Sequence, residues 1–246
     1  FLNLNNYMYQ NLFLTVLIII PSILNSQSFQ TDERVWDMSS QRAFSDLGRM
    51  KTSKSNLSNI EGSKYFDLNF KEGTVENYNK DIFFETTMRY NAYDDEIEII
   101  YIINGKKTVR GLLKDKKIII KFDGNKYQYL SFKNSKDRTV NGYLIDLFKG
   151  SKIQLYQKKR KKFLKGKIAK NSLDISHSPK YVDDFELYIS NDGSVPRYIK
   201  NSKKELINYF RKSEEIKKYI KSEKLKFDNF QSFVKVLDFH ENNYKD

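Results

Sequence analysis

The feature that most constrains the fold is a series of short apolar segments between about Lys64 and Ile189, recurring roughly every eight to twelve residues. The segments read KYFDLNF, TVENYN, DIFFETTMRYN, EIEIIYII, TVRGLL, KIIIKFDGNKYQYLSF, GYLIDLF and KIQLYQ. Turn signals separate them, at Glu72-Gly73, Asn104-Gly105, Asp123-Gly124, Asn141-Gly142 and Lys149-Gly150. The pattern predicts a mainly β fold, an antiparallel meander curled into a half-barrel or barrel so that its edges are not left exposed.

The hydrophobic period changes after residue 198. Apolar residues in SKKELINYFRKSEEIKKYIKSEKLKF recur at spacings of three and four, opposite a lysine-rich face. Ser202, followed three residues later by Glu205, is a capping box that marks a helix start. A second apolar stripe follows in NFQSFVKVLDFHENN, with Asp228 as the expected cap. The sequence therefore predicts two or three C-terminal α-helices packed on the β domain.

The N-terminus predicts export. An apolar run from Leu12 to Ile20 is too short to cross a bilayer of about 30 Å as a helix, but it has the length of a signal-peptide core. We expect cleavage near Ser26 and a periplasmic or secreted protein, with residues 1–7 upstream of the true start. A buried N-terminal helix or an uncleaved anchor is the alternative. The domains expected are a signal peptide (1–26), a polar, partly helical leader (27–62), the antiparallel β domain (63–198) and the helices (199–246).

Composition excludes several chemistries. The chain has no cysteine and two histidines, so disulfides, a thiolate nucleophile, Cys-ligated zinc and a histidine-based metal site are not expected. We expect neither a cofactor nor a metal. The 44 Lys and Arg residues against 31 Asp and Glu give a formal charge of +13, which favours polyanionic partners.

Acidic residues are most concentrated in MRYNAYDDEIEI, where four of them occupy five positions. We interpret it as the bend between two strands, with an Arg89–Glu cross-strand pair stabilising the hairpin by a few tenths of a kcal/mol. Calcium binding by Asp94, Asp95 and Glu96, or acid–base catalysis by Glu96 and Glu98, are the alternatives. The candidate binding residues are Arg89, Tyr90, Asn91, Tyr93, Asp94, Asp95, Glu96 and Glu98.

Basic residues are concentrated in KKRKKFLKGKIAK, in which eight of thirteen residues are basic and none is acidic. A solvated hairpin tip is one interpretation, and contact with an anionic surface is the other. The candidate polyanion-binding residues are Lys158, Lys159, Arg160, Lys161, Lys162 and Lys165.

Several segments of the chain resemble those of a known protein family. FKEGTV, RYNAYDDEIEI, GYLIDLFKGSKIQLY and the terminal lysine-rich helices resemble a family of uncharacterised exported proteins of Bacteroidota with a Tyr-Asn-x-Tyr-x-Asp-Glu-x-Glu core. The resemblance covers about Tyr65 to Phe239 and implies export to the periplasm or beyond. It implies no activity and no catalytic residue.

We therefore expect a non-catalytic binding or scaffold protein of the cell envelope. Its expected partner is an envelope protein or an anionic glycan or lipid, nucleic acid is not expected, and the mature chain should have no transmembrane span. One alternative is a carrier of a lipid or other apolar ligand in a half-barrel pocket; the other is a hydrolase of glycans or peptides using Glu96 and Glu98. The lining residues expected for the carrier are Phe83, Ile99, Tyr101, Ile119 and Phe132.

Overall fold

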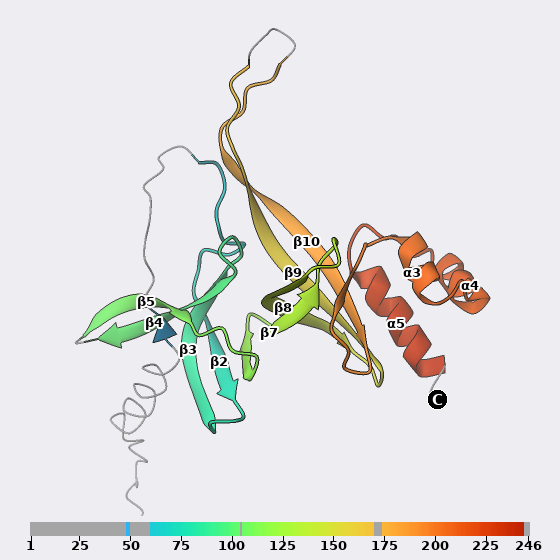
Figure 1. The fold of residues 1–246 in the computed structure, drawn as a ribbon, viewed down its shortest axis with the longest axis horizontal. Helices are drawn as coiled ribbons and strands as arrows, with labels where there is room; N and C mark the ends of the chain where they lie inside the picture. The colour runs from blue at the N-terminus through green and yellow to red at the C-terminus, as the bar shows by residue number, and fades with distance from the viewer. Residues whose placement is uncertain (1–47, 50–59, 104, 170–173, 244–246) are drawn as a thin grey trace, which may run out of the picture. The chain divides into compact units, whose positions relative to one another are not determined.

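The computed structural model describes residues 48–49, 60–103, 105–169 and 174–243. The predicted signal peptide and nearly all of the polar leader, including Trp36, lie outside the described residues. The described chain is mainly β, with three helices that follow the last strand, which confirms the predicted fold class (Figure 1).

Eleven strands form one mixed sheet. They are β1 (Gly48–Arg49), β2 (Lys71–Asn77), β3 (Ile82–Asn91), β4 (Glu96–Ile103), β5 (Lys106–Leu112), β6 (Ile118–Phe122), β7 (Asn125–Lys133), β8 (Thr139–Lys149), β9 (Ile153–Leu164), β10 (Lys180–Asn191) and β11 (Arg197–Ile199). The order is β1-β5-β4-β3-β2-β6-β7-β11-β10-β9-β8, and β8 also pairs with β7. Strands β7 to β11 therefore form a closed ring of pairings, completed by one parallel contact between Arg197 and Lys133.

The predicted turns at Asp123-Gly124 and Lys149-Gly150 are confirmed as connections between strands, whereas two other predicted turns are wrong because their glycines lie inside strands. Asp123 and Gly124, with φ of 51° and 68°, join β6 to β7 as a tight hairpin. Gly73 and Gly142, predicted as turns, lie inside β2 and β8. A Cβ on Gly73 would lie 2.4 Å from the carbonyl oxygen of Lys121, so glycine is needed there for close strand packing.

Two strand predictions also need correction. KYFDLNF is not a strand, because its only ladder contact is a bridge between Tyr65 and Asn91. Strand β9 runs well beyond KIQLYQ to Leu164, and its partner β10 corresponds to none of the predicted strands. The charged residues of β10 obscured its strand pattern; they lie opposite the basic residues of β9 along a twelve-pair register.

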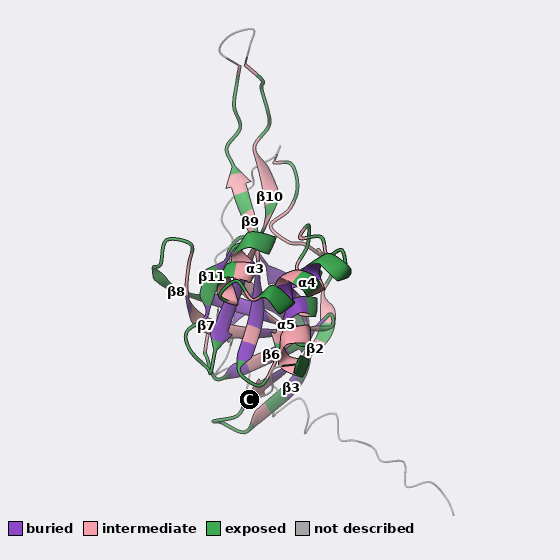
Figure 2. Ribbon diagram, turned by 90° about the vertical axis from the view of Figure 1, so that its right-hand side faces the viewer, coloured by how far each residue is buried: buried purple, intermediate pink, exposed green. Residues whose placement is uncertain are grey.

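The interior has three apolar clusters. The first joins β2 to β8 around residues such as Val75, Met88 and Ile120. The second lies between strands β8 to β11 and the helices, and the third, with Phe132 and Tyr188, belongs to the ring strands. Figure 2 shows the helices lying over buried segments of these strands.

The helices are α3 (Lys203–Tyr209), α4 (Glu214–Ser222) and α5 (Gln231–Asn243). Ser202 accepts a hydrogen bond from the Glu205 backbone N–H at 3.3 Å, which confirms the predicted helix start. The amphipathic run breaks at Arg211 and Lys212, both with positive φ. The predicted Asp228 cap was wrong: the Asn229 side chain accepts from Gln231 N–H at 2.8 Å. In the described part of the chain, no helix has the length and apolar character needed to traverse a membrane.

Candidate functional site

The acidic stretch is a bend between two paired strands. Asn91 ends β3, and its side-chain oxygen accepts a hydrogen bond from the Asp94 backbone N–H at 3.0 Å. Asp95 has a φ of 53°, a left-handed conformation that Asp tolerates better than most residues. Arg89 lies opposite Glu98 in the antiparallel register, as the cross-strand interpretation requires.

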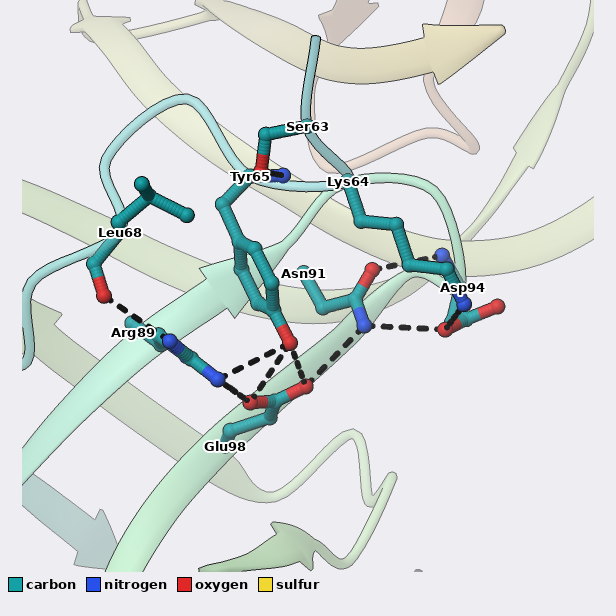
Figure 3. A network of polar contacts seen from close by, with 8 residues as sticks. All are labelled: Ser63, Lys64, Tyr65, Leu68, Arg89, Asn91, Asp94 and Glu98. Carbon is teal, nitrogen blue, oxygen red and sulfur yellow. Dashed lines mark hydrogen bonds and ion pairs between the residues drawn. The ribbon is translucent and has the colours of Figure 1, made fainter. Parts of the chain in front are cut away.

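Glu98 is the centre of a closed polar network (Figure 3). Its side chain is only 1% exposed, Arg89 Nε donates to Oε2 at 2.9 Å, and Arg89 Nη2 forms an ion pair with the same oxygen at 2.9 Å. The Tyr65 hydroxyl donates to Oε1 at 2.8 Å and the Asn91 amide donates to the same oxygen at 3.1 Å. These donors satisfy the buried carboxylate, which in turn holds its neighbours in place.

Arg89 connects this network to the segment that precedes β2. Its guanidinium lies over the Tyr65 ring at 3.9 Å and over the Phe70 ring at 4.4 Å. Its Nη1 also donates to the Leu68 carbonyl oxygen at 2.9 Å. The Arg89–Glu98 pair therefore fastens residues 65–70 onto the β3–β4 hairpin.

Asp95 forms a second network, which joins the same hairpin to β8 and β9. Its carboxylate accepts from the Tyr90 hydroxyl at 2.6 Å and from the Tyr143 backbone N–H at 3.3 Å. The Lys158 ammonium lies 2.5 Å from Asp95 Oδ1 and donates to the Tyr143 carbonyl oxygen at 3.0 Å. Gly142 leaves the room for this pair, because a Cβ there would lie 2.4 Å from the carboxylate and 2.7 Å from the ammonium.

The electrostatics of this network follow from its burial. Burial lowers the pKa of the Lys158 ammonium, and the nearby Asp95 charge opposes that shift. Burial also raises the pKa of Tyr90 well above its usual value, and Asp95 adds to the effect. Burial therefore favours the neutral Tyr90 hydroxyl, which donates to Asp95, and the Asp95 charge favours the protonated form of Lys158.

The other acidic residues point to separate partners. Asp94 accepts from the Asn91 amide at 2.9 Å and pairs with Lys64 at 3.3 Å, whereas Asp95 turns to Lys158. Glu96 is partly buried over Gly111 of β5. Among the described residues, no group of three His, Cys, Asp or Glu side chains is placed to hold a metal ion. This geometry does not favour the calcium alternative.

Tyr93 lies at the exposed end of the bend. Its ring meets the Tyr181 ring edge to face at 5.1 Å, and the Lys64 ammonium lies 5.2 Å from its centroid. Tyr93 is 42% exposed and is therefore accessible to a partner.

The basic candidates do not form one cationic surface. Arg160 pairs with Glu186 at 3.1 Å, Lys162 pairs with Asp184 at 2.9 Å, and Lys161 pairs with Asp183, all across the β9–β10 ladder. Lys158 is buried against Asp95, and burial lowers the pKa of the partly buried Lys159. Lys165, beyond the end of β9, is exposed.

The predicted carrier lining is divided between different parts of the fold. Phe83 is 53% exposed, whereas Ile99 is buried in the first cluster and Phe132 in the third. Tyr101 packs against the first cluster and Ile119 is partly buried.

A crevice of about 660 Å³ lies between the β8–β9 turn, the end of β10 and helices α3 and α5. Lys152, Asp192, Tyr209, Arg211 and His240 are among its lining residues. Sequence reasoning missed it because four separate segments supply the lining and no motif marks them. The lining combines both signs of charge with aromatic rings, so it does not specify one class of ligand.

No protein-family model, curated protein or solved structure matches this chain.

Proposed function

We propose that the protein is an exported component of the cell envelope that binds other envelope components and does not catalyse a reaction. The observation that carries the proposal is that two carboxylates of the acidic stretch, Glu98 and Asp95, are paired within the fold. Glu98 is enclosed by Arg89, Tyr65 and Asn91, and Asp95 is held by Lys158 and Tyr90. These two carboxylates connect separate parts of the fold through ion pairs and hydrogen bonds.

Carboxylates that hold parts of a fold together in this way are poorly suited to hydrolysis. A glycosidase of the usual kind needs two carboxyl groups that reach the substrate, one of them free to exchange a proton. Glu98 is sealed from solvent and accepts several hydrogen bonds. Of the two carboxyl groups in the hydrolase alternative, Glu96 is the more accessible, and Glu98 is not available as the second catalytic carboxyl group.

The fold offers binding surfaces in place of a catalytic centre. Strands β9 and β10 extend past the last buried residues, Lys158 and Leu187, as a two-stranded arm (Figure 1). Many side chains of this arm are exposed and therefore accessible to a partner. The apolar run Leu12–Ile20 supports export, and envelope components are then the partners within reach.

Chemical cross-linking in intact source cells tests the proposal. The full chain should fractionate with the envelope and form an adduct with an envelope component. Recovery in the cytosol without an adduct would contradict it.

A catalytic role has its own test, which is hydrolysis of envelope glycans and peptides by the purified chain. Glu96→Gln is the informative variant because it leaves the Arg89–Glu98 pair intact, and Glu85→Gln on the exposed face of β3 is the matched control. Turnover that Glu96→Gln abolishes and Glu85→Gln preserves would overturn the proposal.

A further inference from the structure

The β9–β10 arm carries more basic than acidic residues. Within the strands, three of the basic residues of β9, Arg160, Lys161 and Lys162, form ion pairs with the acidic residues of β10. Beyond the Leu164–Lys180 pair, the described residues include Lys165 and Lys167 against one acidic residue, Asp174, and Lys180 itself forms a backbone bridge with Glu61. Asp174 pairs with Lys167. Ion pairs therefore offset most of the basic charge along the strands, and the described part of the arm end also carries an excess of positive charge.

The end of the arm also exposes large apolar side chains. Ile168 is 86% exposed and Ile175 is 79% exposed, more than any other large hydrophobic residue in the described ranges. Leu164, at the last strand pair, is 41% exposed. Isolated exposed apolar residues are ordinary, but these three belong to the same projecting end of the arm as Lys165 and Lys167.

At its base this end is held by Glu61, whose backbone N–H donates to the Pro179 carbonyl oxygen at 2.9 Å and which forms a bridge with Lys180. One backbone bridge joins its two sides, in which Lys167 and His177 each donate an N–H to the other's carbonyl oxygen at 2.9 Å. Figures 1 and 2 both show this end projecting away from the remaining strands and helices. Residues 165–168 and 175–178 are all exposed, so the end is shaped by its backbone pairing and not by a core.

We infer that the end of the β9–β10 arm, residues 164–169 and 174–180, binds the surface of an anionic lipid bilayer. Lysine ammonium groups are attracted to anionic headgroups, and long basic side chains keep their charge at the interface while apolar neighbours enter the acyl region. The two isoleucines provide that apolar part. This inference rests on the proposed function and deepens it, because it names the envelope component that the arm contacts.

A purely polar polyanion fits the same surface less well. Dissolved glycan or nucleic acid would engage the lysines but leave Ile168 and Ile175 in water. The only ring in the described part of the arm end is the imidazole of His177, and no Phe, Tyr or Trp is present there as a larger surface on which a base could stack.

Vesicle flotation with the full chain tests this. The vesicles contain phosphatidylglycerol in phosphatidylcholine, and pure phosphatidylcholine vesicles show the contribution of headgroup charge. The double variant Ile168→Asp/Ile175→Asp should bind the anionic vesicles roughly 100-fold more weakly, since each lost isoleucine contributes about a factor of ten. Lys165→Glu should weaken binding and reduce its dependence on salt.

Matched controls lie far from the arm in sequence. Ile102→Asp changes an isoleucine that is 56% exposed on β4, and Lys136→Glu changes an exposed lysine between β7 and β8. Both should leave vesicle binding unchanged. Far-UV circular dichroism should show all four variants folded, because none of the changed side chains belongs to a core cluster.

Three results would overturn the inference: no binding of the unmodified chain to anionic vesicles, equal losses in the control variants, or isoleucine variants that bind normally while only the lysine variant fails. The last result would indicate a dissolved polyanion or an acidic protein as the partner. An envelope adduct without vesicle binding would overturn this inference alone, whereas vesicle binding without any envelope adduct would overturn only the proposed function.

Discussion

Removing the Asp95 charge should destabilise the protein through Lys158. The Lys158 side chain is 6% exposed and its ammonium lies 2.5 Å from the carboxylate. Asn is the appropriate replacement because it tolerates the left-handed backbone that position 95 requires, so Asp95→Asn isolates the charge.

The magnitude follows from what remains after the change. Leaving one partner of a buried ion pair unpaired typically costs about 3–5 kcal/mol. Lys158 keeps its bond to the Tyr143 carbonyl oxygen, and its pKa is already lowered by burial, so it can lose its proton. We therefore expect a loss of about 2–3 kcal/mol, or roughly 5–10 °C in Tm for a domain of this size.

A double-mutant cycle checks the reasoning. Lys158→Met alone should cost about 1 kcal/mol, because Asp95 keeps the Tyr90 hydroxyl and the Tyr143 N–H. The double variant should be more stable than the sum of the single effects predicts, by about 2 kcal/mol. Urea unfolding followed by far-UV circular dichroism measures each free energy. Additive effects, within about 0.5 kcal/mol, would refute the coupling.

Three further predictions follow from the same structure. Gly142→Ala should destabilise the fold by about 1–3 kcal/mol in urea unfolding, because its Cβ would overlap the Asp95–Lys158 pair, and an unchanged midpoint would contradict this. Glu241→Gln should speed amide hydrogen exchange at Ser151 and Ile153, whose N–H groups the carboxylate binds; unchanged rates would refute it. Stability should fall as pH rises above about 10, because burial raises the pKa of several tyrosines, so that the unfolded chain loses these protons first. The lowered pKa values of Lys158 and Lys159 oppose this loss of stability. Ultraviolet absorbance should show that the buried tyrosines ionise together with unfolding. Ionisation of every tyrosine in the folded chain would refute the prediction.

Local signals predicted much of the fold. The alternation of apolar residues located β2 to β9, and Asp123-Gly124 and Ser202 marked a turn and a helix start because each depends on neighbouring residues only. The Arg89–Glu98 pair was also predictable, since a hairpin register places the two residues opposite each other.

Long-range contacts explain what the sequence could not show. Gly73 and Gly142 look like turn glycines until Lys121 and the Asp95–Lys158 pair come close to them. Lys158 reads as part of a basic run, but the fold places Asp95, 63 positions earlier in the chain, beside it. No pattern within either segment indicates that partnership.

The central claim is that the acidic stretch supports the fold while the arm makes the contacts. The most direct test measures thermal stability and envelope cross-linking on the same preparations of Asp95→Asn and Ile168→Asp/Ile175→Asp. We predict that Asp95→Asn lowers Tm and still cross-links below its Tm, whereas the isoleucine variant keeps its Tm and loses the adduct. An Asp95→Asn protein with unchanged Tm and no adduct would contradict the account.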